Sequence, residues 1–171
     1  MKERNNNITA FGLVAEEPVF NHESNGEDFY KTFITVRRTS GTFDTLPVVI
    51  SDRIIDMKEI KVGDCVMITG QVRSHNLHIG EKSKLELFIF TENIEIYENE
   101  EELPFNNDVV LRGFICKEPI YRVTPLGREI TDVLIAINRA YGKSDYIPCI
   151  TWGRTAKFVG HLPVGLSLIH I

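Results

Sequence analysis

The sequence lacks the features that mark several large classes of protein. It has no run of about 18 apolar residues, so no transmembrane helix is expected. Its N-terminus, MKERNNNITA, is polar and has no apolar signal core, which argues against a cleaved export signal. The three cysteines, Cys65, Cys116 and Cys149, form no close pair. An odd, scattered set fits reduced thiols in the cytoplasm better than a disulfide framework.

Catalytic motifs are missing as well. There is no Gly-rich phosphate loop, no Ser/His/Asp set with supporting context and no cluster with metal-ligand spacing. His75 and His78 lie three residues apart but have no further ligands near them, which indicates a polar hairpin. We therefore expect a protein that is not an enzyme and that binds no cofactor and no metal ion.

What the sequence does contain is an internal repeat. FGLVAEEPVF (11–20) aligns with RGFICKEPIY (112–121) after a shift of 101 residues. The same shift, without a gap, aligns DTLPVVISDR (44–53) with DYIPCITWGR (145–154). Ten of 42 aligned positions are identical, and many others exchange one apolar residue for another. The chain is therefore predicted to hold two copies of one domain.

The two copies differ in charge, which the net value of −5 for the whole chain conceals. The first copy, residues 1–97, carries a net charge of −4. An acidic linker, residues 98–106, adds four glutamates, and the second copy, residues 107–171, has a net charge of +3. The second copy is thus the one suited to a polyanion.

Each copy is predicted to be rich in β-strands. In the first copy, three short segments rich in β-branched and aromatic residues are predicted to be strands, at 8–20, 29–38 and 45–51. Residues 52–60 have the apolar spacing of a short helix. Two further strands are predicted at 65–72 and 85–97. Three strands, a helix and two strands is the order of the five-stranded OB-fold barrel, whose long first strand bends, here at Gly12. We predict an all-β fold with short helices, formed by two tandem OB-fold barrels. A small β-sandwich is the alternative.

The second copy resembles bacterial single-stranded DNA-binding proteins. The similarity lies in NDVVLRGFICKEPIYRVTPLGREITDVLIAINR (107–139) and DYIPCITWGRTAKF (145–158), and the first copy shares it mainly through the repeat. The resemblance implies base stacking on aromatics beside basic side chains, and assemblies of four OB-folds. A two-copy chain of this tandem form would reach four by dimerising. It further implies a nucleoid-associated cytoplasmic protein with single-stranded DNA, and replication or repair proteins, as partners.

One predicted strand of the second copy carries the only tryptophan. Because side chains alternate along a strand, Tyr146, Pro148, Ile150 and Trp152 should share one face. Burial in the barrel is the alternative for Trp152, since tryptophan is usually well buried. The resemblance places Tyr146 and Trp152 among the stacking sites, with Tyr141 near another.

Basic residues complete the expected DNA site of the second copy. They are Arg112, Lys117, Arg122, Arg128, Arg139 and Arg154. Arg139 and Arg154 recur in the first copy as Arg38 and Arg53, so a structural role is the alternative for these two.

The first copy departs from this pattern. Thr45 and Ser51 stand where the second copy has Tyr146 and Trp152. Its weaker candidates for DNA contact are Arg37, Arg38, Phe43, Arg53 and Arg73. We expect the first copy to bind weakly or to serve mainly in assembly.

The repeat also predicts an incomplete second copy. After Val62-Gly63 the first copy continues through 65–97, whereas only LSLIHI (166–171) follows Val164-Gly165. We therefore expect a truncated second OB-fold that lacks its last two strands, and we expect residues 166–171 not to be native. The linker segment EEELPF (100–105) resembles the acidic recruiting tip of the family, but a solvated spacer is the favoured interpretation.

Taken together, these features predict sequence-independent binding and protection of single-stranded DNA in replication, recombination or repair. Two alternatives stay open. One is a protein–protein interaction module of a replisome or phage assembly, and the other is binding of single-stranded RNA.

Overall fold

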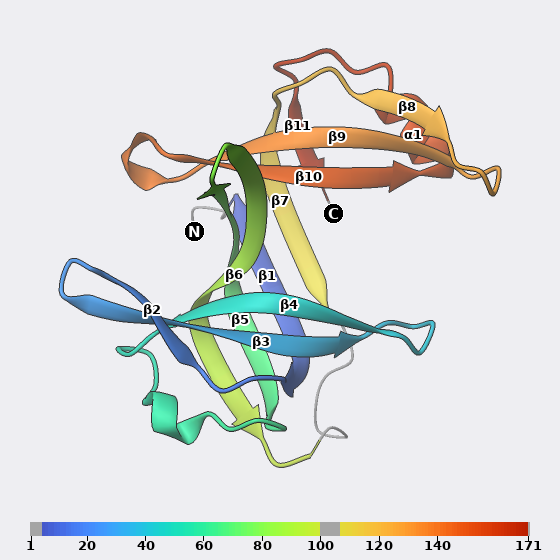
Figure 1. Cartoon of the computed structure of the whole chain (residues 1–171). Helices are drawn as coiled ribbons and strands as arrows, with labels where there is room; N and C mark the ends of the chain where they lie inside the picture. The colour runs from blue at the N-terminus through green and yellow to red at the C-terminus, as the bar shows by residue number, and fades with distance from the viewer. Residues whose placement is uncertain (1–4, 100–106, 171) are drawn as a thin grey trace. The chain divides into compact units, whose positions relative to one another are not determined.

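The computed structural model describes residues 5–99 and 107–170 (Figure 1). Contacts divide these residues into two compact units, which we call the N-terminal barrel (7–73, 86–99 and 107–109) and the C-terminal unit (5–6, 74–85 and 110–170). The hairpin at 74–85 lies in the first repeat copy but packs with the second. Most of the predicted acidic linker, including the EEELPF segment, lies outside the described residues. No helix in the described part is long and apolar enough to cross a membrane.

The strands of the N-terminal barrel close into a ring. Its elements are β1 (Asn6–Val14), β2 (Val19–Ser24), β3 (Glu27–Arg37), β4 (Phe43–Ser51), the 3-10 helix η1 (Met57–Glu59), β5 (Cys65–Ile79) and β6 (Lys82–Tyr97). β1 pairs with both β3 and β5, β3 with β4, and β5 with β6, and a parallel pairing of β4 with β6 completes the ring (Figure 1). This is the predicted OB-fold order. The ends of β5 and β6 that meet at 74–85 belong to the C-terminal unit.

The first predicted strand is divided in two. β1 ends at Val14 and β2 begins at Val19, and Pro18, which has no backbone N–H to donate, lies between them. β1 changes its partner from β5 to β3 at Leu13, directly after Gly12. A Cβ on Gly12 would lie 2.4 Å from the backbone oxygen of Thr35. β1 therefore pairs with one strand before Gly12 and with another after it, as expected for a first strand that bends at this glycine.

The helix predicted over 52–60 is wrong in extent. Only Met57–Glu59 is helical, as a 3-10 turn that begins where the Asp56 side chain accepts a hydrogen bond from the Lys58 backbone N–H. The apolar residues whose spacing predicted a helix instead pack into the core. Ile60 is buried in the core, and Ile54 and Ile55 pack against it. The segment closes one end of the barrel with side chains rather than with helical turns.

The C-terminal unit repeats the first part of this topology. Its elements are β7 (Asp108–Ile115, whose first two residues belong to the N-terminal barrel), β8 (Ile120–Val123), β9 (Glu129–Asn138), η3 (Ala140–Gly142), β10 (Ser144–Trp152), α1 (Gly153–Val159) and β11 (Ser167–His170). β9 pairs with β7, β8 and β10. Helix α1 buries Ala156 and Val159, and the Thr131 hydroxyl donates to the Ala156 carbonyl at 2.7 Å.

The C-terminal segment forms a strand, which corrects one prediction. β11 pairs antiparallel with β7 and sets Leu168 opposite Gly113. In the first copy Val66 lies opposite Gly12 in the same way. The prediction that the second copy lacks counterparts of both last strands is therefore wrong for the first of the two.

At Gly113, β7 lies close against β9. A Cβ there would lie 2.4 Å from Ile135 Cγ2 and 2.5 Å from the Ala136 carbonyl oxygen. Backbone atoms cannot move aside as the end of a flexible side chain can. The glycine is thus required by the crossing of the two strands.

We expect Gly113→Ala to lower the free energy of unfolding of the C-terminal unit by about 1–3 kcal/mol, the usual cost of overpacking. Urea unfolding followed by the fluorescence of Trp152, the only tryptophan, measures this unit. Gly160→Ala is the control, because the nearest atom to its Cβ, the Cβ of Tyr121, lies 3.1 Å away, against 2.4 Å for the nearest atom at Gly113. Equal losses in the two variants would contradict the argument.

Candidate nucleic-acid interface

One side of β10 is exposed along its length. Tyr146, Pro148, Ile150 and Trp152 all face solvent, and the exposed fraction of Trp152 is 54%. The intervening Ile147 is buried. The predicted shared face is confirmed, and Trp152 is not a core residue.

The opposite face of β10 points into the unit. Cys149 lies there, and burial raises the pKa of its thiol to about 11. The thiol therefore stays protonated at neutral pH and is a poor nucleophile.

The exposed face extends across the neighbouring strands. Trp152 lies opposite Ile130 of β9, and Ile130 lies opposite Arg122 of β8. Since directly paired residues project to the same side of a sheet, Arg122 and Trp152 share this face at a distance of two strands. Arg122 also forms an ion pair with Asp132, from Nε to Oδ2 at 2.6 Å, so its charge is partly compensated.

A second acidic residue is engaged near the same end of the sheet. Glu129 accepts a hydrogen bond from the Tyr121 hydroxyl at 2.6 Å and pairs with Lys157 at 2.9 Å. The hydrogen bond from Tyr121, followed by that from Lys157, lowers the pKa of Glu129. The acidic residues here are thus held by local partners.

The remaining predicted cations differ in how available they are. Lys117, Arg128 and Arg154 are exposed, and within the described residues none of them has an ion-pair partner. Arg112 is half-buried on β7. The side chain of Tyr141 lies outside what the structure describes, although its backbone is part of η3.

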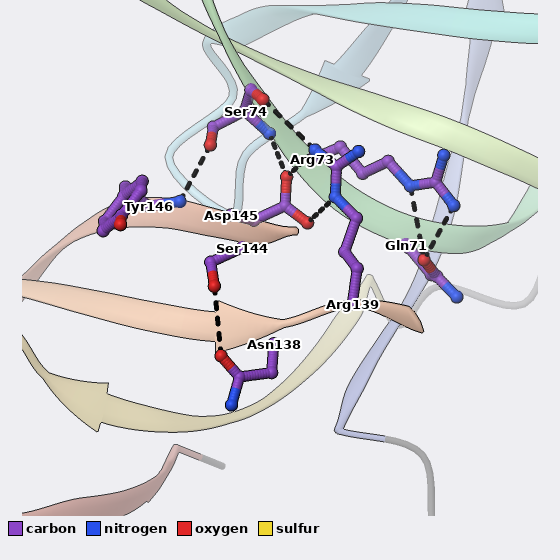
Figure 2. Close-up of polar contacts among 8 residues, drawn as sticks. All are labelled: Gln71, Arg73, Ser74, Asn138, Arg139, Ser144, Asp145 and Tyr146. Atoms are coloured by element: carbon purple, nitrogen blue, oxygen red, sulfur yellow. Dashed lines mark hydrogen bonds and ion pairs between the residues drawn. The ribbon is translucent and has the colours of Figure 1, made fainter. Parts of the chain in front are cut away.

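Arg139 has a structural role. Its Nε donates to Asp145 Oδ2 at 2.5 Å, and a second nitrogen pairs with Asp145 Oδ1 (Figure 2). The same guanidinium donates to the backbone carbonyl of Ser74 at 3.3 Å. DNA contact and a structural role were both considered for Arg139, and these contacts are structural.

Ser74 belongs to the β5–β6 hairpin and uses three of its polar groups on this cluster (Figure 2). Besides its carbonyl, its backbone N–H donates to Asp145 Oδ1 at 2.7 Å, and its hydroxyl accepts from the Tyr146 N–H at 2.8 Å. Asp145 is fully buried and has these donors as partners. The hairpin therefore fixes the beginning of β10, next to the first aromatic of the exposed face.

The equivalent pair in the first copy is open to solvent. Arg38 and Asp44 form the same ion pair, with Nε and Oδ2 at 2.5 Å, but their side chains are 60% and 41% exposed. The hydrogen bond between them lowers the pKa of Asp44 and raises that of Arg38. The repeat preserved the pair, and in the second copy it is more buried and also contacts Ser74 of the hairpin.

In the N-terminal barrel, the face that corresponds to the Trp152 face is filled. Ser51, at the Trp152 position, is buried opposite Phe29. The Arg73 guanidinium lies 3.4 Å from the ring centroid of Phe90, which in turn contacts Phe29. Lys31 nearby pairs with Glu86 at 2.6 Å. On this face, aromatic and cationic side chains contact one another and not a ligand.

The other first-copy candidates are divided. Arg53 lies 3.6 Å from Glu27 and donates to the Gly26 carbonyl. Arg37 and Phe43 are exposed. In the repeat, Glu27 corresponds to Arg128 and Arg53 to Arg154, so the second copy has a cation at the position of the acid that pairs with Arg53.

One exposed aromatic of the C-terminal unit was not among the predicted site residues. Phe114, on β7, is 46% exposed and lies opposite Ala136 of β9. The repeat pairs it with Leu13, and this exchange of an aliphatic for an aromatic side chain was the available signal.

Comparison with known proteins agrees with this geometry. Residues 106–168 match the single-strand binding protein family. The matched segment is almost the whole of the second repeat copy. Single-stranded DNA-binding protein A of Bacillus subtilis is 36% identical over 61 residues, and protein B of the same organism is 33% identical over 57 residues. These alignments cover about a third of the chain, and they span 36% and 50% of the two relatives.

A solved structure resembles the whole chain. The wild-type single-stranded DNA binding protein from Thermus aquaticus is 19% identical, has a TM-score of 0.75, and the match covers 96% of this chain and 82% of that one. At 19% identity the similarity establishes the fold alone, and the matched region includes both repeat copies. The predicted tandem OB-fold is therefore confirmed.

We expect Asp145→Ala to lower the free energy of unfolding of the C-terminal unit by about 3 kcal/mol, because it leaves Arg139 and the Ser74 N–H without their buried acceptor. Trp152 fluorescence during urea unfolding reports the loss. Asp44→Ala is the matched control, since it removes the exposed twin of the same ion pair, and circular dichroism should show a much smaller change. A similar cost at both positions would rule out a special contribution from the hairpin.

Proposed function

We propose that this protein binds single-stranded DNA without sequence preference and protects it during replication, recombination or repair. The exposed aromatic face of β10, in a repeat copy with net positive charge, is the observation that carries the proposal. Trp152 and Tyr146 provide two planar apolar surfaces on the same face of one strand. Stacking on such surfaces tolerates every base, because each base has a π-face.

The geometry supports an extended path for the strand. Tyr146 and Trp152 are six residues apart on one strand, which at the usual rise is about 20 Å. Bases stack along this line while Lys117, Arg128 and Arg154 contact phosphates and release counterions. The mechanism needs planar surfaces and cations but no bond-making group, so we propose a binding protein and not an enzyme.

The two repeat copies are proposed to have different roles. The copies, 1–97 and 107–171 joined by the linker 98–106, each provide one OB-fold. The second binds DNA, and the first binds weakly or serves in assembly, since its corresponding face is filled by Arg73, Phe90 and the Lys31–Glu86 pair. A dimer of the chain would bring together four OB-folds.

We propose that the protein is cytoplasmic and associated with the nucleoid. The three cysteines are free thiols, which fits the reducing cytoplasm, and association with the nucleoid would follow from DNA binding. Replication or repair proteins are the expected macromolecular partners.

Replacement of Tyr146 or Trp152 by alanine should weaken binding of an oligo-dT by about 5-fold to 150-fold, the equivalent of one lost stacking contact. Anisotropy of a labelled oligonucleotide measures this without relying on tryptophan emission. Phe43→Ala, which removes an equally exposed aromatic from the first copy, is the control and should bind as the parent does. If Phe43→Ala were as harmful as the other two, the assignment of the site to the second copy would fail.

Salt dependence tests the cationic part of the site. Arg154→Gln should reduce the slope of log affinity against log salt by about 0.7, the value for one phosphate contact on a single strand. Arg38→Gln, whose guanidinium is already paired with Asp44, should leave the slope unchanged.

The alternatives are separated by the same titration. A folded protein that fails to bind oligo-dT at low salt would favour the protein–protein interaction module. Tighter binding of oligo-U than of oligo-dT would favour single-stranded RNA.

A further inference from the structure

Two exposed aromatic side chains of the C-terminal unit stand in one row across three strands. Phe114 of β7 lies opposite Ala136 of β9, and Ala136 lies opposite Tyr146 of β10. Directly paired residues in antiparallel strands project their side chains to the same face. The row therefore carries an aromatic ring at each end and a methyl group between them.

The spacing of this row suits one planar ligand. Neighbouring strands are about 4.8 Å apart, so the attachment points of Phe114 and Tyr146 are about 10 Å apart. A flat ring in van der Waals contact with an aromatic ring on each side needs about 7–8 Å, twice the usual carbon–carbon contact distance. Phe114 and Tyr146 are 46% and 45% exposed, and in the described part of the chain neither makes a contact with another ring.

The position of each member of the row is fixed by its surroundings. Gly113 brings β7 so close to β9 that a Cβ on it would lie 2.5 Å from the Ala136 carbonyl oxygen. The Tyr146 N–H is held by the Ser74 hydroxyl at 2.8 Å (Figure 2). Both rings are thus mounted on backbone that is restrained by contacts, so the gap between them is pre-formed rather than created by the ligand.

The first repeat copy provides a natural comparison. Its corresponding row is Leu13, Thr35 and Thr45, with the same register between the strands. All three members differ, and each difference favours a flat ligand in the second copy: an aromatic replaces an aliphatic or polar residue at both ends, and the smaller alanine replaces threonine in the middle. The fold accepts either set, because these three strands pair in the same register in both copies.

We propose that Phe114, Ala136 and Tyr146 form a subsite that holds one nucleobase between the two rings, above the Ala136 methyl group. This inference rests on the proposed function and goes beyond it, since it adds Phe114 and Ala136 to the interface and assigns them to the clamping of a single base. Trp152, six residues along β10, stacks a different base of the same strand.

The test uses substitutions taken from the first copy, which that fold already accommodates. Phe114→Leu removes one ring, and Ala136→Thr fills the space between the rings. Each should weaken binding of an oligo-dT by about 5-fold to 150-fold in the full chain, while urea unfolding and circular dichroism stay those of the parent. Leu126→Ala, which removes an exposed apolar side chain from the turn after β8, is the matched control and should not alter affinity.

A second measurement separates clamping of a base from contact with the backbone of the strand. An oligonucleotide of the same length made entirely of abasic sites keeps the phosphates but has no ring to insert. The parent should prefer oligo-dT over this polymer, and both variants should lose part of that preference while their salt slopes stay unchanged.

The outcomes distinguish this subsite from the general proposal. A parent protein that binds neither polymer would overturn the proposed function itself. A parent that binds oligo-dT, with both folded variants equal to it in affinity and in preference, would overturn the subsite and leave the proposed function intact. Loss in Phe114→Leu without loss in Ala136→Thr would mean that Phe114 stacks a base alone, and the clamp would be wrong.

Discussion

The antiparallel register between β9 and β10 is the constraint on which the rest of the C-terminal unit depends. The two strands pair over nine consecutive positions, from Ser144 opposite Asn138 to Trp152 opposite Ile130. Side chains alternate along a strand, so a slip of one residue would send Trp152 inward and Ile147 outward. Asp145 holds this register, because its buried carboxylate must meet Arg139 and the Ser74 N–H at one place only. A shifted register would leave this carboxylate buried without a partner, which would destabilise the fold strongly. The ion pair therefore favours the observed register.

The two repeat copies show how one scaffold supports a filled face and an open one. Both have Gly at the strand crossing, the arginine–aspartate pair and the same strand order. In the N-terminal barrel the parallel strand β6 lies along β4 and supplies Phe90, on which Arg73 stacks. In the C-terminal unit the corresponding strand β10 has only β9 as a paired neighbour among the described residues, and its aromatics face solvent. The roles we propose for the copies thus follow from two differences: the strand β6 beside β4 in the first copy, and the aromatic residues of β10 in the second.

Several features could be predicted from the sequence because they depend on local patterns. The repeat predicted two related domains, the alternation in DYIPCITWGR predicted the shared face of Tyr146 and Trp152, and Gly12 predicted the bent first strand. The helix predicted over 52–60 was wrong in extent. The spacing of Ile54, Ile55 and Ile60 is compatible both with a helix and with an irregular segment that packs onto the end of a barrel. The strand at Ser167–His170 was missed because its partner, β7, lies more than fifty residues away in the sequence, and pairing over that distance leaves no local signal.

By itself the sequence determined the fold class, the two copies and the aromatic face, because hydrophobic periodicity and self-similarity are properties of neighbouring residues and of aligned segments. Only the tertiary structure decided what each charged or aromatic group contacts. It assigned Arg139 to Asp145 and Ser74, placed Arg73 on Phe90, and brought Phe114 into one row with Tyr146. The physical reason is that an ion pair, a stacked ring or a cross-strand row depends on distances between residues far apart in the chain, and the packing of the strands sets those distances.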